Sequence, residues 1–300
     1  MNFLQQEKGN VTVIVALTLS ALLGVAALVI DVGNLYANRI KLVNTADAAA
    51  LAGIALLPED PQGAMLEAQK FAQENGVAAD QCQVEISQNK KRITVRVSKP
   101  VDYSFARIFG LQSQTVSAKA VAQVSALFSA TGVVPFGIEK QAFLFGQLYH
   151  LKEGGGSGYD GNYGGLALGG NGASIYKYNI INGYNGQLRV GDWVSTETGN
   201  MSGPTQTGVE ERINNCHAGC THDNYEKGCS RVVTVPILDS LMVNGRKDVK
   251  IVGFARFFLN GVGGSGNDNY VEGYFLQEFT DGDGDEEAGD FGLRSTRLVE

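Results

Sequence analysis

The sequence predicts an α+β protein with an N-terminal transmembrane helix, a small α+β domain and a mainly antiparallel β domain beyond it. Residues Val11–Ile30 form an uncharged run of twenty residues. Further along, alternating apolar residues bounded by Gly, Asn and Asp recur, as in β-strands. The chain has 300 residues, 44% hydrophobic and 18% charged, so it exceeds an average domain of about 150 residues and is too apolar for a disordered chain.

The net charge argues against nucleic acid as a partner. The chain holds 24 Lys and Arg against 31 Asp and Glu, a net charge of −7 at pH 7, which is the wrong sign for a phosphate backbone. Eight of the acidic residues lie between Glu272 and Asp290, where there is no Lys or Arg. The remaining 23 acidic residues balance the 24 basic ones, so the negative charge belongs to one loop.

The first element is the uncharged run Val11–Ile30. At about 1.5 Å per helical residue it spans about 30 Å, the thickness of a bilayer's hydrocarbon core. A cleaved secretory signal has a shorter apolar run of about 7 to 15 residues, so we interpret residues 11–30 as a membrane anchor. The helical pattern continues past Asp31 into an Ala-rich stretch whose small residues allow close packing. We expect one unbroken helix to about Ile54.

The orientation of this helix follows from the cysteines rather than from the basic residues. Lys8 lies before the helix, and Arg39 and Lys41 lie after it. The positive-inside rule, by which Lys and Arg are enriched on the cytoplasmic side, therefore does not determine the orientation. Three cysteines within fourteen residues favour an oxidising compartment. We therefore expect residues 1–10 inside the cell and the domains after the helix outside, at the cell surface or in the periplasm.

The sequence of the proximal domain, residues 31–126, predicts a mixture of helices and strands. Asp60 as N-cap and Pro61 at the first helical position begin a short amphipathic helix. Two alternating runs, Cys82–Ile86 and Ile93–Val97, form a hairpin. A short helix follows over residues 105–109, and the third strand covers residues 116–124.

The distal domain, residues 132–300, is mostly β. A loop with ten Gly in nineteen residues covers Gly154–Gly172. Helical patterns are short, at Ala173–Ile181 and Val209–Asn214. The predicted strands are Leu188–Val194, Val232–Leu238, Val249–Leu259 and Tyr270–Phe279. The result is a mainly antiparallel sandwich or barrel with Gly-rich and acidic loops.

Three sequence segments at and beyond the ends of the apolar run resemble a known family. They are Lys8-Gly9-Asn10-Val11 with Ile30-Asp31-Val32-Gly33-Asn34-Leu35-Tyr36, and Asn44-Thr45-Ala46-Asp47-Ala48-Ala49-Ala50-Leu51-Ala52-Gly53. Together they are similar to the N-terminal signature of TadG-like proteins of the TadE/TadG family, which belong to Flp, or tight adherence, pilus assembly. The resemblance implies a single-pass, surface-facing component of a pilus or secretion machine, with a pilin-like proximal domain and with other Tad, Flp pilus or pseudopilin subunits as partners.

The resemblance also raises the question of proteolytic cleavage after Gly9. Pilins and pseudopilins are cut after a Gly and carry Glu at the fifth mature position, where its carboxylate pairs with a neighbour's terminal amine. Cleavage after Gly9 places Ile14 there. Because that pairing is lost, we expect a protein other than the major filament subunit, and prepilin-type cleavage at Gly9 stays open.

The strongest local cluster of chemically active residues is Cys216-x3-Cys220-x8-Cys229, with His217 and His222 inside it. In an oxidising compartment it predicts a disulfide that closes a short loop. The alternative is a zinc site of three thiolates and one imidazole, although the usual pairing of ligands two residues apart is absent. The disulfide candidates are Cys82, Cys216, Cys220 and Cys229.

The acidic loop carries a partial calcium motif. Asp281, Asp283 and Asp285 stand at positions 1, 3 and 5 as in a calcium loop, and Asp290 is a further potential ligand. Glu286 occupies position 6, where an EF-hand has Gly. The alternative is a solvated acidic loop without a metal.

The sequence predicts no enzyme. Its three histidines do not stand beside a nucleophile, and it contains no Walker A loop, no Gly-x-Ser-x-Gly elbow and no His-Glu-x-x-His pair. Gly261–Gly266 matches a dinucleotide pattern, but a strand follows it where a phosphate site needs a helix N-terminus. We therefore predict a non-enzymatic, membrane-anchored assembly component without a cofactor. The alternative function is an anchored surface binding or adhesion module, in which either calcium or the Gly- and Tyr-containing loop at Gly154–Gly172 makes the adhesive face.

Overall fold

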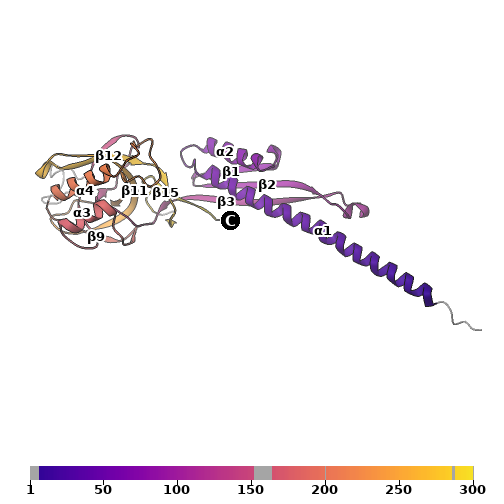
Figure 1. The fold of residues 1–300 in the computed structure, drawn as a ribbon. Helices are drawn as coiled ribbons and strands as arrows, with labels where there is room; N and C mark the ends of the chain where they lie inside the picture. Colours follow the sequence, from indigo (N-terminus) through magenta and orange to yellow (C-terminus); the bar gives the residue numbers. More distant parts are fainter. Residues whose placement is uncertain (1–6, 152–163, 200, 286–287, 300) are drawn as a thin grey trace, which may run out of the picture. The chain divides into compact units, whose positions relative to one another are not determined.

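The computed structural model describes residues 7–151, 164–199, 201–285 and 288–299 of the chain. These residues fold into two compact units. Among the described residues, the first comprises residues 7–123 and 297–299, and the second belongs to Val124–Thr296. Figure 1 shows the order of the elements along the chain.

The first unit begins with one long helix, α1 (Glu7–Ile54), of 48 residues. It passes through Asp31-Val32-Gly33 without a break, which confirms the predicted continuous helix. Residues of the Ala-rich part are buried on one side, among them Leu42, Ala46 and Ala50. Their spacing of four residues places them on a single face of the helix, as the core-facing side of a packed helix requires.

The second helix, α2 (Pro61–Glu74), starts as the sequence predicts. The Asp60 side chain accepts a hydrogen bond of 2.8 Å from the Gly63 backbone N–H, so it caps the first turn. The helix packs on α1. Its side of the contact consists of three fully buried alanines, which are Ala64, Ala68 and Ala72. With alanines on both helices, the backbones can approach closely.

Three antiparallel strands complete the first unit in the order β1-β2-β3. They are β1 (Cys82–Ile86), β2 (Arg92–Asp102) and β3 (Ser113–Leu127), with the short helices η1 (Ala79–Gln81) before β1 and η2 (Ala106–Phe109) between β2 and β3. Ile93, Val95 and Val97 are buried on the side of β2 that meets α1. Strand β2 is longer than predicted, because its second half, from Ser98, lacks the apolar alternation that marks a strand in sequence.

The second unit is built on a sheet whose central strands are antiparallel, as predicted. In spatial order its strands are β5 (Ile138–Glu139), β10 (Val232–Leu238), β11 (Asp248–Gly263), β12 (Tyr270–Leu276) and β6 (Leu148–Leu151), with β9 (Trp193–Thr196) and β7 (Leu166–Ala167) at the side. Within the series from β5 to β6, β5 runs parallel to its neighbour β10 and the other pairs are antiparallel. Strand β9 pairs with the start of β11 on one side and with β7 on the other. Gly261–Gly263 ends β11 at its antiparallel hairpin with β12, as the sequence predicts.

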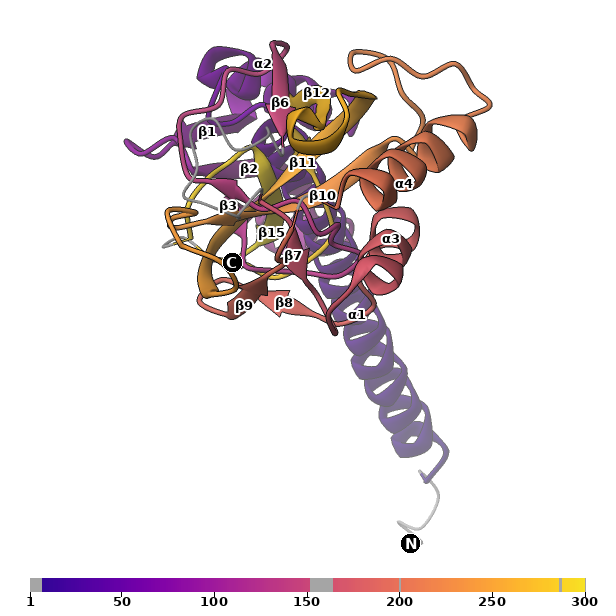
Figure 2. The ribbon, with the colours of Figure 1, turned by 90° about the vertical axis from the view of Figure 1, so that its left-hand side faces the viewer.

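Two helices, α3 (Ala173–Asn182) and α4 (Ser202–Asn214), lie side by side next to this sheet (Figure 2). Their buried residues Tyr176, Ile180 and Val209 join one hydrophobic core with Phe257 and Phe275 of the sheet. Helix α4 begins seven residues before the predicted Val209, because its first turn of Ser202, Gly203 and Pro204 is poor in helix-forming residues.

Short strand pairs complete the second unit. Strand β13 runs parallel to β15, while β4 pairs with β8, and β14 with the last residues of β3, in antiparallel fashion. Their bounds are β4 (Ser129–Ala130), β8 (Leu188–Arg189), β13 (Glu278–Phe279), β14 (Gly284–Asp285) and β15 (Leu293–Leu298), and a 3-10 turn, η3 (Gly266–Asp268), precedes β12. Most of the Gly-rich loop, residues 154–163, lies outside the described residues. The predicted fold class, α+β with an N-terminal apolar helix and a mainly antiparallel second part, is confirmed.

Candidate functional site

The first candidate site is the apolar part of α1. The helix is long and apolar enough to cross a membrane, and none of its most apolar stretch is buried within the protein. Two of its hydroxyl groups donate to the helix backbone, Thr18 to the carbonyl of Ile14 and Ser20 to that of Ala16. An exposed apolar surface with its polar groups satisfied internally is what a lipid environment requires.

The apolar run ends at Asp31, whose side chain is only 4% exposed. Its carboxylate accepts hydrogen bonds from three successive backbone N–H groups of the β2–β3 connection. The distances are 2.6 Å from Ser104, 3.2 and 3.0 Å from Phe105 to the two oxygens, and 2.7 Å from Ala106. These N–H groups begin η2, whose first residues lack a side-chain cap of their own. Asp31 therefore caps a helix from another part of the chain.

Sequence reasoning did not find this bond. It predicted a short helix over residues 105–109 closed by Gly110, and the structure confirms it, with Gly110 at φ 86°. The partner across 73 residues could not be inferred from local patterns. The available signal was the position of Asp31 itself, because a carboxylate at the edge of an apolar segment needs hydrogen-bond donors.

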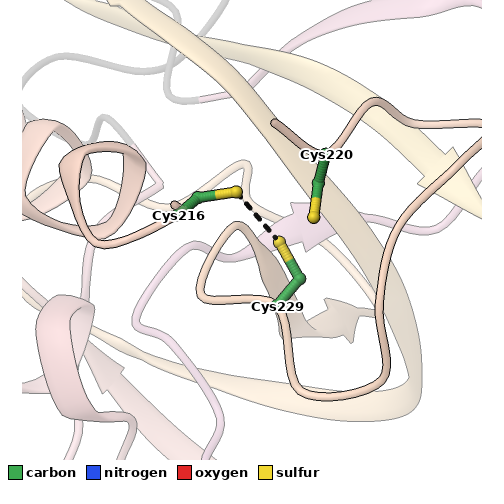
Figure 3. A group of neighbouring side chains, drawn as sticks. All are labelled: Cys216, Cys220 and Cys229. Carbon is green, nitrogen blue, oxygen red and sulfur yellow. Dashed lines mark hydrogen bonds between the residues drawn. The ribbon is translucent and has the colours of Figure 1, made fainter. Parts of the chain in front are cut away.

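The second candidate site is a cluster of three cysteines (Figure 3). The sulfur atoms of Cys216, Cys220 and Cys229 all lie within 4.8 Å of one another, and those of Cys216 and Cys229 are 3.6 Å apart. Cys216 follows the end of α4 and Cys229 precedes β10, so the loop between these elements brings the three thiols together. All four cysteines of the chain are free thiols in this structure.

Two arginines hold this loop in place. Arg231 donates to the carbonyl of Cys220 at 3.0 Å, and its guanidinium lies 4.4 Å from the centre of the Phe258 ring. Arg212 donates to the carbonyl of Ser230 at 2.9 Å. Because these bonds fix the backbone on both sides of Cys229, the cluster is part of the folded structure.

The thiols differ in acidity. A hydrogen bond from the Cys220 backbone N–H, with help from the neighbouring thiols, lowers the pKa of Cys216. Burial raises the pKa of Cys229 to about 11, and its thiol neighbours add to the effect. Of these two, Cys216 therefore ionises before Cys229, and its thiolate is the better nucleophile of the pair.

The other predicted ligands of the cysteine cluster lie elsewhere. Among the described residues neither histidine of the loop joins the group of close ligand atoms. His217 is exposed, and the ring of His222 stacks on Tyr274 with 3.9 Å between centroids. Cys82 is buried in β1, and burial raises the pKa of its thiol, as for a structural thiol. Three thiolates alone leave one position of a tetrahedral zinc site without a described protein ligand.

The four carboxylates of the predicted calcium loop are not gathered in one place. Asp281 and Asp283 are exposed, and Asp285 lies in β14. Both carboxylate oxygens of Asp290 accept from the Arg294 Nε, at 3.0 and 2.9 Å. Within the described part of the chain, the cysteines are the group close enough to share an ion. Calcium binding stays a prediction. For Asp290 to act as a ligand, its hydrogen bonds with Arg294 must first break.

The fold and these sites define a class of protein, one with a single apolar helix able to cross a membrane that continues into a small α+β unit. Within that unit, residues 9–72 match the family described as Flp pilus-assembly TadE/G-like. Residues 83–122 match the family described as Tad-like Flp pilus-assembly. Most of the first unit thus matches Tad pilus-assembly family models, and the TadG-like resemblance is confirmed.

The matches also mark where this assignment stops. Both family descriptions name pilus assembly, and neither names an enzyme. The second unit, Val124–Thr296, lies beyond both matched ranges. No significant match is found among curated proteins or among solved structures.

Proposed function

We propose that this protein is a non-enzymatic, membrane-anchored component of Flp (Tad) pilus machinery that carries its second unit outside the membrane. The observation that supports this most directly is the junction in α1. An exposed apolar segment that fits a bilayer lies within the first matched range and continues without a break into the part of α1 that packs in the first unit. The helix is thus both the anchor and part of the core of the first unit.

The cysteine cluster supports the outward orientation. Three thiols within 4.8 Å of one another, one of them with a lowered pKa, would be oxidised readily in an extracytoplasmic compartment. We propose a disulfide between Cys216 and Cys229, whose sulfur atoms lie 3.6 Å apart. By the chain-entropy estimate, a bond that closes a loop of about 15 residues stabilises the fold by about 3 kcal/mol.

Intact-mass analysis of the protein isolated from its native membrane, before and after reduction and alkylation, tests this pairing. We expect two alkylated thiols without reduction and four after it, with peptide mapping that links Cys216 to Cys229. The same spectrum shows whether residues 1–9 have been removed by cleavage after Gly9. Four free thiols in the native protein would contradict the disulfide and favour the zinc interpretation of the cluster.

Crosslinking in the membrane tests the proposed partners. A photoreactive residue replaces Leu22, which is exposed on the apolar part of α1. We expect it to form adducts with other pilus or pseudopilin subunits through their membrane helices. Leu66 on α2, equally apolar and exposed, is the matched control in the first unit. Adducts with lipid alone at position 22, in cells that assemble pili, would argue against helix-mediated assembly.

A further inference from the structure

The connection between β2 and β3 exposes an unusual concentration of large apolar side chains. Ile108 is 81% exposed and Phe109 is 85% exposed. Phe105 and Leu111 on either side are also exposed. We call residues 103–112 the hairpin tip. Exposing apolar side chains of this size to water costs free energy, and their grouping indicates a surface that contacts an apolar partner.

The course of β2 along α1 places this tip at a defined level. At the start of β2, the Ile93 Cδ1 atom lies 2.5 Å from where a Cβ on Gly53 would stand. At its far end, Ser104 binds Asp31. The helix between Gly53 and Asp31 covers about 33 Å, and the eleven residues of β2 cover about 36 Å. The strand therefore follows α1 back toward its N-terminal, apolar half, as Figure 1 shows.

Asp31 ties the tip to the exit of the membrane helix. It directly follows Ile30, the last residue of the apolar run. Its four hydrogen-bond contacts with the N–H groups of residues 104–106 hold η2 at the level where α1 leaves the hydrocarbon core. From this juxtaposition we infer that the hairpin tip is a second membrane contact, which inserts Ile108 and Phe109 into the lipid surface beside α1.

The chemistry of the tip fits the interface between lipid and water. Its apolar residues stand next to Tyr103 and to Arg107, which pairs with Asp102 at 2.8 Å. Aromatic and aliphatic side chains with a polar and basic rim are typical of segments that lie in a membrane surface. The bilayer is the occupant that the fold dictates, because any membrane that receives residues 11–30 also reaches the level of Asp31.

Rigidity distinguishes the tip from a loose apolar loop. Asp31 caps the first N–H groups of η2, and Gly110 closes it in a left-handed conformation. The tip is thus held in one geometry before it meets lipid, which reduces the entropy lost on insertion. Two points of contact would also restrict rotation and tilt of α1, so the direction in which the first unit projects would be fixed.

Tryptophan fluorescence in vesicles tests this inference on the full chain. The native Trp193 is first replaced by Phe, and Phe109→Trp is added in that background. The protein is reconstituted into phosphatidylcholine vesicles with or without brominated acyl chains, which quench tryptophan on contact. We expect Trp emission at position 109 to shift to the blue and to lose most of its intensity in the brominated vesicles.

Three variants in the same background make the result specific. Leu66→Trp, on the exposed face of α2 near the other end of β2, should stay unquenched. Leu22→Trp reports insertion of α1 itself and should be quenched strongly. Asp31→Ala removes the cap on η2, so with Phe109→Trp it should weaken quenching at position 109.

The outcomes separate this inference from the proposed function on which it rests. Quenching at positions 22 and 109, with none at 66, supports the membrane contact of the tip. Quenching at 22 without quenching at 109 overturns it and leaves the anchor intact, with a protein partner as the remaining occupant of the tip. A lack of quenching at position 22 would overturn both the anchor and the inference.

Discussion

Close packing between α1 and α2 depends on Gly53, and the substitution Gly53→Ala tests it. A Cβ at this position would lie 2.5 Å from Ile93 Cδ1, 2.7 Å from the Ala64 carbonyl oxygen and 3.0 Å from the Ala68 Cβ. The Ile93 methyl can rotate away, but the carbonyl oxygen belongs to the backbone of α2. The helices must therefore separate to admit even one methyl group.

Gly33→Ala on the same helix is the matched control. Nothing lies within 4 Å of a Cβ there. Both substitutions gain about 1 kcal/mol of helix propensity, so this contribution cancels when the two variants are compared. Overpacking a tight core costs about 1–3 kcal/mol, and we expect Gly53→Ala to be less stable than Gly33→Ala by that amount.

Hydrogen exchange in detergent measures the difference within the first unit. Protected amides of β2 exchange through opening of the unit, so a loss of about 1–3 kcal/mol accelerates their exchange by roughly 5- to 150-fold relative to Gly33→Ala. Amides of β11 in the second unit serve as the internal reference. Equal exchange rates of β2 in the two variants would refute the close contact between α1, α2 and β2.

Three further predictions follow from individual sites. Phe257→Ala, in the core of the second unit, should lower the free energy of unfolding by about 3–5 kcal/mol in calorimetry, and Phe279→Ala at a partly exposed position should cost less. In the reduced protein, iodoacetamide should modify Cys216 at lower pH than Cys229, because the pKa of Cys216 is lowered and that of Cys229 is raised to about 11; mass spectrometry that found Cys229 modified first would contradict this order. Asp60→Ala removes the cap of α2 and should lower the free energy of unfolding by about 1 kcal/mol in thermal unfolding. Asp60→Asn, which keeps a capping side chain, should remain close to the original protein in the same measurement.

Much of the first unit could be predicted because its signals are local. The twenty apolar residues, the Ala-rich continuation to Ile54 and the cap at Asp60 each act within a few residues of sequence. Alternation in Ile93–Val97 identified β2, although not its polar second half. The bond from Asp31 to Ser104 could not be predicted, because it joins elements 73 residues apart and depends on how β2 lies along α1.

In the second unit, sequence indicated which residues could react but not how they are arranged. Spacing alone marked Cys216, Cys220 and Cys229 as a group, and the structure brings their sulfur atoms within 4.8 Å. The same spacing could not show that His222 turns away to stack on Tyr274. In the acidic loop, the carboxylates followed a calcium pattern, yet the engagement of Asp290 by Arg294 depends on tertiary packing.

The most direct test of the account is the topology of single-cysteine variants in spheroplasts. In a cysteine-free background, Gln5→Cys, Leu66→Cys and Leu144→Cys place one thiol before α1, one in the first unit and one in the second. A membrane-impermeant maleimide should label positions 66 and 144 in intact spheroplasts and position 5 only after lysis. Labelling of position 5 alone, or of no position before lysis, would contradict a membrane-anchored protein whose two units lie outside.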